Sequence, residues 1–438
     1  MIRKFKREGG TQMGTNEKKT TRRKFLKTMG AGAAVLAAEP LWRPRGGFWA
    51  QEKSPIIIGH QCDYTGFLAS WGYWMDQAAK YAVKVINDAG GINGRKVEYV
   101  MEDTASDPAI GTRKLRSLIQ KWNADFVIGC INASPATGSL PAARELKTVY
   151  FMQSSSDEVI TKFGSRYTFM GGGVELSKIT YGVPWAVKNL GKKFTFCVYD
   201  MAWGYTHVDG STPIIEKMGG KVLEKIFAPL GTKDFYPYLR KIPPETEVLY
   251  GVFSGPPALA FLTQTFEIGI HKKMKRYVDV GVMEGSNTET IGGVAEDCWY
   301  MTFCPRRLKF KDTENIRRLR KAINVNDDGI ENGTLQVLCG SRYWAAYENV
   351  FWIKRAIEKS GWKSKKDNGA FIEALEGMCV KEGADFPQGD KCMRAKDHFI
   401  LHDLWMGHVE NNKMEEKHKF SFKEEPFPPQ ADFTKEKI

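Results

Sequence analysis

The chain has 438 residues, of which 26% are charged, and its 64 Lys and Arg exceed its 51 Asp and Glu by 13. Nine of these excess charges lie in residues 1–50, which hold 12 basic and 3 acidic residues, so the rest of the chain carries only +4. Such a small excess argues against a nucleic-acid partner. No later stretch reaches the ~18 consecutive apolar residues of a membrane span. The remaining 388 residues can form more than one hydrophobic core, so we expect two domains.

The N-terminal segment is typical of an export signal. The run Thr21-Arg22-Arg23-Lys24-Phe25-Leu26-Lys27 matches the twin-arginine pattern, and a short, weakly apolar stretch over residues 29–38 follows it. We therefore expect residues 1–50 to be a twin-arginine signal peptide, cleaved after Ala50, that directs the chain to the periplasm. The alternative is an ordinary basic N-terminal arm.

Strands and helices alternate along the rest of the chain, which predicts parallel, doubly wound sheets of the α/β class. The pattern restarts after Gly171-Gly172-Gly173, so the two blocks fit two lobes. Strands are expected at residues 56–60, 96–102, 126–129, 149–152, 194–199, 221–226, 248–252 and 276–280. Helices are expected at residues 71–89, 109–122, 138–146, 179–188, 206–218, 234–241, 258–268, 343–359 and 370–377.

The chain is expected to cross between the lobes three times, near Gly173, near residues 299–302 and within residues 386–408. The N-terminal lobe then comprises residues 54–173 and 301–385, and the C-terminal lobe residues 174–300 and 386–412. Residues 413–438 are rich in Pro and charge without periodicity, which predicts an extended tail.

The most informative segment is residues 81–98, which contains Asp88-Ala89-Gly90-Gly91-Ile92-Asn93-Gly94. Physically it is a helix end followed by a tight turn into a strand. Its sequence closely resembles a segment of the branched-chain amino-acid-binding family, the type I periplasmic solute-binding proteins of ABC importers. The resemblance covers most of residues 55–408. It implies two α/β lobes joined by a three-segment hinge, a monomer that captures a small molecule without a cofactor or catalysis, and an ABC permease as partner.

Two hydroxyl clusters match the part of the family that holds the ligand carboxylate. Both follow predicted strands of the first block, where helix N-termini favour anions. The alternative for each cluster is a simple helix cap. The residues expected at the carboxylate are Ser134 and Thr137 in the first cluster and Ser154, Ser155 and Ser156 in the second.

Two glutamates match the positions where family members bind the ligand ammonium. Glu175 follows the first crossing, and Glu284 lies in Gly281-Val282-Met283-Glu284-Gly285 after a predicted strand. Each alone could equally be a solvated surface group, but the two together predict an ammonium or amide site.

Aromatic residues distinguish the chain from binders of aliphatic amino acids. Trp71 follows the first strand, Trp203 follows the strand ending near residue 199, and Phe253 follows the strand at 248–252. Aromatic walls suit a planar ligand or a cation, although ordinary packing is the alternative. Aromatic amino acids, aromatic carboxylates and small amides all remain open as ligands.

The cysteines and histidines predict no metal site, because their spacing lacks any zinc pattern. Of eight cysteines, Cys379 and Cys392 flank a polar loop and are the expected disulfide of an exported chain. An enzyme is the less favoured alternative, since no Gly-x-Ser-x-Gly elbow or metal motif accompanies His60, His207 or His398. A sensor that reports the ligand to a membrane receptor is a further alternative.

Overall fold

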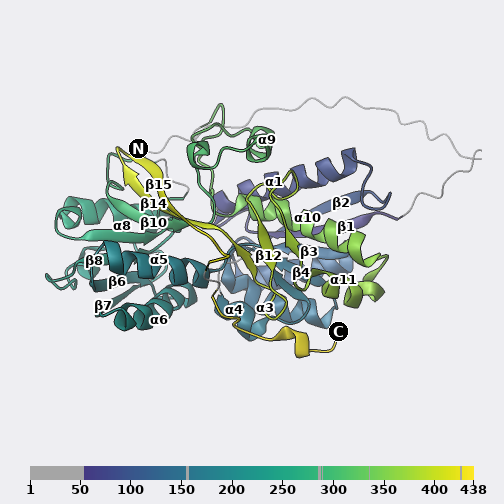
Figure 1. The fold of residues 1–438 in the computed structure, drawn as a ribbon, viewed down its shortest axis with the longest axis horizontal. Helices are drawn as coiled ribbons and strands as arrows, with labels where there is room; N and C mark the ends of the chain where they lie inside the picture. The colour runs from purple at the N-terminus through teal and green to yellow at the C-terminus, as the bar shows by residue number, and fades with distance from the viewer. Residues whose placement is uncertain (1–53, 154–156, 285–287, 289, 335, 425–426) are drawn as a thin grey trace, which may run out of the picture. The chain divides into compact units, whose positions relative to one another are not determined.

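The computed structural model describes residues 54–153, 157–284, 288, 290–334, 336–424 and 427–438. These residues form two mostly parallel sheets with helices packed on them, and a third, small antiparallel sheet (Figure 1). The expected α/β class with doubly wound sheets is therefore confirmed. The expected signal peptide, residues 1–50, lies outside the described residues.

The first lobe is built on a five-stranded parallel sheet in the order β2-β1-β3-β4-β5. Its strands are β1 (Ile56–Cys62), β2 (Val97–Asp103), β3 (Phe126–Gly129), β4 (Val149–Met152) and β5 (Thr168–Met170). Its helices are α1 (Ala69–Asp88), α2 (Pro108–Arg116), α3 (Ala133–Glu145), α4 (Asp157–Phe163), α10 (Tyr343–Ser360) and α11 (Asn368–Leu375). Their apolar side chains form two clusters with the sheet, one containing α1, α10 and α11 and the other α2, α3 and α4. In the first, Phe126 of β3 packs against Phe371 of α11 at a ring distance of 4.7 Å.

The sequence of helix α1 explains which face of this helix is buried and how the chain turns into β2. Its buried residues recur at helical spacing, so one face of the helix meets the core. After the helix ends at Asp88, the chain turns at Gly90 and Gly91, whose φ angles of +94° and +81° suit glycine. A Cβ at Gly91 would lie 2.0 Å from the carbonyl oxygen of Arg95, so the turn into β2 requires a glycine there.

The second lobe is built on a seven-stranded sheet in the order β15-β14-β10-β9-β8-β6-β7, in which only β14 and β15 run antiparallel to their neighbours. Its strands are β6 (Lys193–Tyr199), β7 (Lys221–Ala228), β8 (Val248–Val252), β9 (Lys275–Asp279), β10 (Cys298–Thr302), β14 (Leu404–Glu410) and β15 (Lys413–Phe420). Its helices are α5 (Glu175–Asn189), α6 (Ala202–Lys217), α7 (Tyr236–Leu239) and α8 (Gly255–Glu267).

The third sheet contains β11 (Cys379–Val380), β12 (Lys391–Met393) and β13 (Ile400–His402), and helix α9 (Glu314–Ala322) lies between β10 and α10 in sequence. Cys379 of β11 and Cys392 of β12 are paired across this sheet and joined by a disulfide bond, which is the pairing expected from the sequence. No other cysteine among the described residues forms a disulfide bond.

Two expected boundaries differ in the structure. Residues 386–402 do not return to the second lobe, because Phe399 bridges Met170 of β5 and the third crossing comes only between β13 and β14. Residues 413–420 are not a tail but the edge strand β15, which pairs with β14 along its length. Only residues beyond β15 return to the first lobe, where Phe427 and Phe433 are buried.

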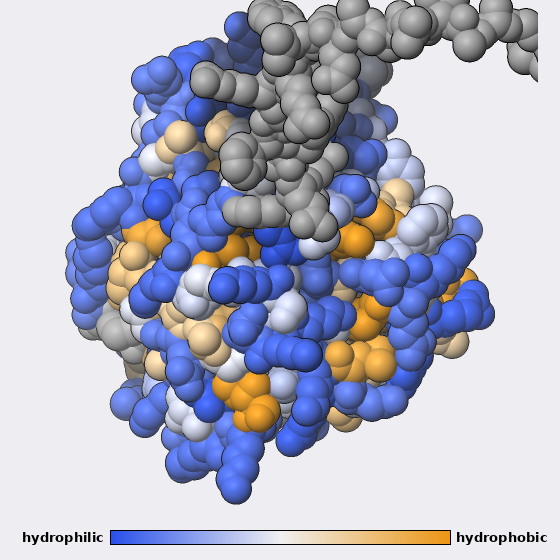
Figure 2. Space-filling model, turned by 90° about the vertical axis from the view of Figure 1, so that its right-hand side faces the viewer, coloured by the Kyte–Doolittle hydropathy of each residue, from blue (hydrophilic) through white to orange (hydrophobic). Residues whose placement is uncertain are grey.

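The surface offers no large apolar face in the view of Figure 2, where hydrophobic residues form small patches among hydrophilic ones. Among the described residues, no helix combines the length and the apolar character that a membrane crossing requires.

Candidate functional site

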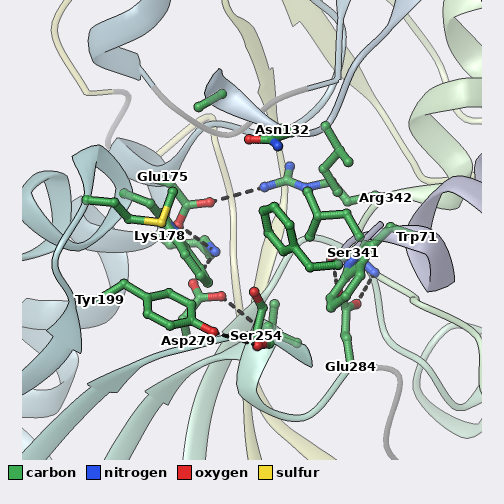
Figure 3. Close-up of a pocket in the computed structure, with 18 residues that line it drawn as sticks. Trp71, Asn132, Glu175, Lys178, Tyr199, Ser254, Asp279, Glu284, Ser341 and Arg342 are labelled. Atoms are coloured by element: carbon green, nitrogen blue, oxygen red, sulfur yellow. Dashed lines mark hydrogen bonds and ion pairs between the residues drawn. The ribbon is translucent and has the colours of Figure 1, made fainter. Parts of the chain in front are cut away.

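A pocket lies where strands of both sheets end. Parallel strands place the loops after their carboxyl ends along one edge, which is the usual ligand position in such sheets. From the first lobe, Trp71 follows β1 and Asn132 follows β3; from the second, Trp203 follows β6 and Ser254 follows β8. Figure 3 shows Trp71, Asn132 and Ser254 around one space, which Trp203 also lines.

The pocket walls are mainly aromatic and aliphatic. Trp71 and Trp203, both expected from the sequence, line it together with Phe67 and Tyr199. The indole nitrogen of Trp203 is buried and has no hydrogen-bond partner among the described residues. Since a buried donor without an acceptor is costly, this N–H is suited to a ligand acceptor.

Glu284 is held by neutral donors from the first lobe, an arrangement that we call the Glu284 clasp (Glu284, Trp71 and Ser341). The Trp71 indole nitrogen donates to Oε2 at 2.8 Å, and Ser341 donates through its backbone nitrogen to Oε1 at 2.5 Å and through its hydroxyl to Oε2 at 2.6 Å. The carboxylate is 5% exposed. Burial raises the pKa of Glu284 although these hydrogen bonds oppose the shift.

Glu175 is held by charged donors in a second arrangement, the ion cluster (Glu175, Lys178, His207, Asp279 and Arg342). Lys178 Nζ lies 2.6 Å from Glu175 Oε2 and also contacts Asp279 Oδ2. Arg342 Nη2 lies 3.1 Å from Glu175 Oε1, and Arg342 Nη1 donates to the carbonyl of Gly173 at 2.6 Å. Residues 341 and 342 therefore connect α10 to both glutamates.

The charge balance of the ion cluster sets the protonation of Glu175. Burial alone would raise its pKa, but the charge of Lys178, the hydrogen bond and charge of His207 and the charge of Arg342 together hold the pKa well below its ordinary value. An ionised Glu175 can only accept from His207 Nε2, 2.8 Å away, so this nitrogen carries the proton.

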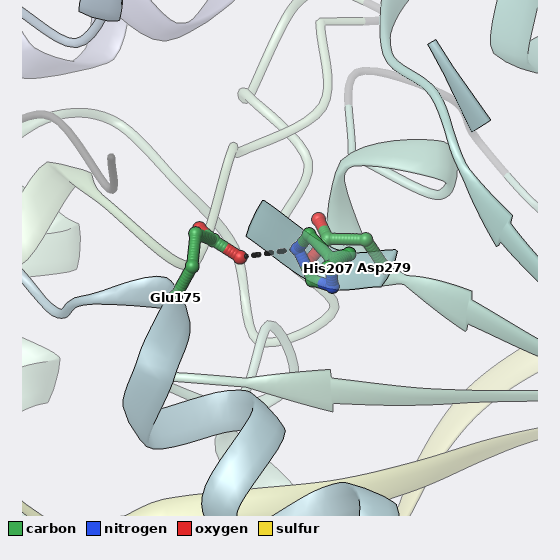
Figure 4. Close-up of side chains that lie close together, drawn as sticks. All are labelled: Glu175, His207 and Asp279. Atoms are coloured by element: carbon green, nitrogen blue, oxygen red, sulfur yellow. Dashed lines mark hydrogen bonds and ion pairs between the residues drawn. The ribbon is translucent and has the colours of Figure 1, made fainter. Parts of the chain in front are cut away.

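The same cluster contains the only group of potential metal ligands among the described residues. Glu175, His207 and Asp279 offer ligand atoms within 4.8 Å of one another (Figure 4). However, the ammonium of Lys178 bridges the two carboxylates, so the positive charge that a metal would supply is already present. These residues fit an ion-pair network better than a metal site.

Known proteins are similar to this chain over most of its length. The family model described as "Periplasmic binding protein" matches residues 55–414. The chain belongs to the periplasmic binding protein family. A curated relative, Leu/Ile/Val-binding protein homolog 3 of Brucella melitensis, is 25% identical over 333 residues, which cover 75% of this chain and 85% of the relative.

Solved periplasmic binding proteins have the same fold. The solute-binding protein of an ABC transporter from Rhodopseudomonas palustris HaA2, in complex with p-hydroxybenzoic acid, has a TM-score of 0.71 at 19% identity, covering 84% of this chain and 97% of the other. The branched-chain amino acid transporter substrate binding protein LivJ from Streptococcus pneumoniae, in complex with isoleucine, has a TM-score of 0.69 at 18% identity, covering 84% and 99%.

Several residues expected at the ligand of this periplasmic binding protein lie elsewhere. Ser134 and Thr137 do not line the pocket: the backbone of Ser134 is capped by Asn132, and the Thr137 hydroxyl donates to the Ser134 carbonyl at 2.8 Å within α3. Phe253 is fully buried in the core of the second lobe, where it packs on Phe261. The other expected carboxylate ligands, Ser154, Ser155 and Ser156, lie outside the described residues.

Three charged residues of the pocket, Lys178, Asp279 and Arg342, were not predicted from the sequence. Asp279 is the last residue of β9, and a charged residue at the carboxyl end of a parallel strand is a signal that could have identified it. Lys178 lies one helical turn after Glu175, a spacing that favours ion pairs. No local signal pointed to Arg342, which is 167 residues away from Glu175 in sequence.

Proposed function

We propose that this periplasmic binding protein is the extracytoplasmic solute-binding component of an ABC importer and that its ligand is a small aromatic carboxylate. The observation that carries the ligand class is a set of buried N–H donors in the pocket that are not all bonded to groups of the protein. A ligand that fills such a pocket must supply acceptors, and a carboxylate supplies two charged oxygens that accept strongly from N–H groups.

These buried N–H donors come from three side chains. The Trp203 indole N–H has no partner among the described residues. Arg342 has five N–H groups, and two hydrogen bonds, to the Gly173 carbonyl and to Glu175, are made within the described part of the chain. Lys178 has three N–H groups and bonds two carboxylates. The carboxylates, in contrast, are already occupied by these donors and by the Glu284 clasp.

The apolar part of the ligand is expected to lie between aromatic rings. Phe67, Trp71, Tyr199 and Trp203 line the pocket, and flat walls of this kind favour a planar ring. The p-hydroxybenzoic acid complex of the Rhodopseudomonas palustris protein supports this class by analogy of fold.

An α-amino acid is the second candidate. The names of the curated Leu/Ile/Val-binding relatives and the presence of Glu175 and Glu284 in the pocket favour it. It ranks below the aromatic acids because its ammonium would need a carboxylate that is not already bound to donors of the protein.

Calorimetric titration of the mature protein tests the ligand class. Benzoate and 4-hydroxybenzoate should bind, and leucine should bind far more weakly. Trp203→Phe keeps a ring but removes the unpartnered N–H, so it should raise the Kd for benzoate by about 10-fold or more. Trp185→Phe, in α5 but outside the pocket lining, is the matched control and should leave the Kd unchanged. Tight leucine binding without benzoate binding would overturn the proposal.

The location and partners are proposed from the sequence and the family. Residues 1–50 would direct a folded monomer through the twin-arginine route to the periplasm, where it would dock on an ABC permease. Replacing Arg22 and Arg23 with lysines should leave precursor in the cytoplasm, and normal export of that variant would contradict the route. Genes for a permease and an ATPase beside this one would favour transport over sensing.

A further inference from the structure

The pocket wall carries its own cation between two carboxylates. Lys178 extends from the first turn of α5, and its ammonium contacts both Glu175 on the same helix and Asp279 at the end of β9. Its side chain is only 3% exposed. The remaining oxygen of Asp279 accepts the backbone N–H of Gly281 at 2.8 Å.

We propose that Lys178 is a specificity-determining residue: its ammonium occupies the place between Glu175 and Asp279 where a ligand amine would bind, and so excludes amine-bearing ligands. Arg342 contributes by holding the other oxygen of Glu175. The inference rests on the proposed function, because it narrows the ligand class of the same pocket.

The physical reason is that an entering amine meets a like charge and carboxylates whose oxygens all already accept from the protein. The Glu284 clasp has donors on both of its oxygens, as has Glu175. An ammonium that enters the pocket loses its water and gains repulsion from Lys178 in a medium of low dielectric. A ligand that differs only by lacking the amine avoids both costs.

The first experiment uses the unmodified mature protein and two ligands that differ only in the α-amino group, 3-phenylpropanoate and phenylalanine. Calorimetric titration should give a Kd about 10- to 100-fold higher for phenylalanine. Equal or tighter binding of phenylalanine would overturn the inference.

The second experiment removes the internal cation with Lys178→Met. Methionine is unbranched and similar in length to lysine but has no charge. This variant should gain affinity for 2-phenylethylamine, an amine without a carboxylate, by about 10-fold or more over the unmodified protein. Lys188→Met, on an exposed position of the same helix, is the matched control and should gain nothing. A folded Lys178→Met protein that gains no amine affinity would overturn the inference; if it does not fold, Lys178→Gln takes its place.

The titrations distinguish an error in the proposed ligand class from an error in the proposed role of Lys178. If no aromatic carboxylate binds the unmodified protein, the proposed ligand class is wrong, whereas the amine titrations of the Lys178 and Lys188 variants still decide the role of Lys178. If benzoate binds and amine-bearing ligands bind equally well, only the role of Lys178 is wrong.

Discussion

Glu175 and Glu284 line the same pocket, but the protein holds them in opposite ways. Charged donors from both lobes surround Glu175 in the ion cluster, whereas an indole and a serine hold Glu284 in the clasp. The pKa of Glu175 is lowered and that of Glu284 is raised, both against a background of full burial. A carboxylate's partners, rather than its burial, therefore decide its charge in this pocket.

The ion cluster and the Glu284 clasp also join different elements of the fold. The ion cluster joins α5, α6, β9 and α10, so it lies where elements of both lobes meet. The clasp joins the loop after β9 to α1 and to the residues before α10. Both connect the lobes, but only the ion cluster does so with charges whose loss leaves other charges buried and unpaired.

The largest expected effect comes from breaking the ion cluster. Glu175→Gln keeps the size of the side chain but leaves Arg342 without its carboxylate and Lys178 with only Asp279. Urea unfolding should show a loss of about 3–5 kcal/mol in the free energy of unfolding, because a buried charge then lacks a partner. Glu216→Gln, exposed on α6, is the matched control and should change stability by less than about 0.5 kcal/mol. A loss as small as that of the control would show that the cluster is not a buried ion-pair network.

A smaller effect is expected when the clasp loses its charge. Glu284→Gln presents an amide NH₂ group to donors, so one hydrogen bond is replaced by an unfavourable donor contact. We expect a loss of about 1–3 kcal/mol in the same measurement. A larger loss than that of Glu175→Gln would reverse the ranking of the two regions.

The sequence predicted the elements of this fold better than its charged contacts, and the reason is physical. The strand expected at residues 248–252 coincides with β8, because a buried apolar run is a local signal. Helix α9 was missed because its sequence, ENIRRLRKA, is dominated by charge. Strand β15 was not predicted, because charged residues such as Lys413 and Lys417 at an exposed sheet edge obscure the alternation of apolar and polar residues that is typical of a strand.

The pocket residues that were predicted from the sequence are those that follow a strand or match a ligand-binding position of the family. Trp71, Trp203, Glu175 and Glu284 were expected and line it. Hydroxyl residues are a weak signal of a ligand site, since Ser134 and Thr137 make only local hydrogen bonds at the start of α3. Arg342 could not be expected, because ion pairs between distant segments leave no local pattern, and a lone arginine is by default a surface residue.

The two carboxylates should also respond to pH in opposite directions. The pKa of Glu175 in the folded protein lies below its ordinary 4.5, so its stabilisation is present above about pH 4.5 and is lost as the pH falls. The pKa of Glu284 lies above 4.5, so its contribution is present below about pH 4.5 and is lost as the pH rises through the folded pKa.

Comparing each variant with the unmodified protein isolates these contributions. From about pH 7 to about pH 4, the stability difference caused by Glu284→Gln should grow by up to about 1.4 kcal/mol for each unit of pKa shift, while that caused by Glu175→Gln should begin to shrink and continue to shrink below pH 4. Urea unfolding across this range measures both. Parallel slopes would mean that the two carboxylates share one protonation behaviour and that the comparison fails.

The smallest expected effect is the difference in stability between two variants of helix α1, in which a tryptophan loses a hydrogen bond to a charged acceptor or to a neutral one. Trp71 and Trp74 both lie on α1 and both donate through the indole nitrogen at 2.8 Å, Trp71 to the Glu284 carboxylate and Trp74 to the backbone carbonyl of Val337. Trp→Phe at either position removes the same atoms, so cavity costs largely cancel between the two. Because a hydrogen bond to a charged group contributes more than a neutral one, Trp71→Phe should cost about 1 kcal/mol more than Trp74→Phe in the free energy of unfolding. In a Glu284→Gln background this excess should disappear, whereas an excess that persists would show that the charge of Glu284 does not act through Trp71.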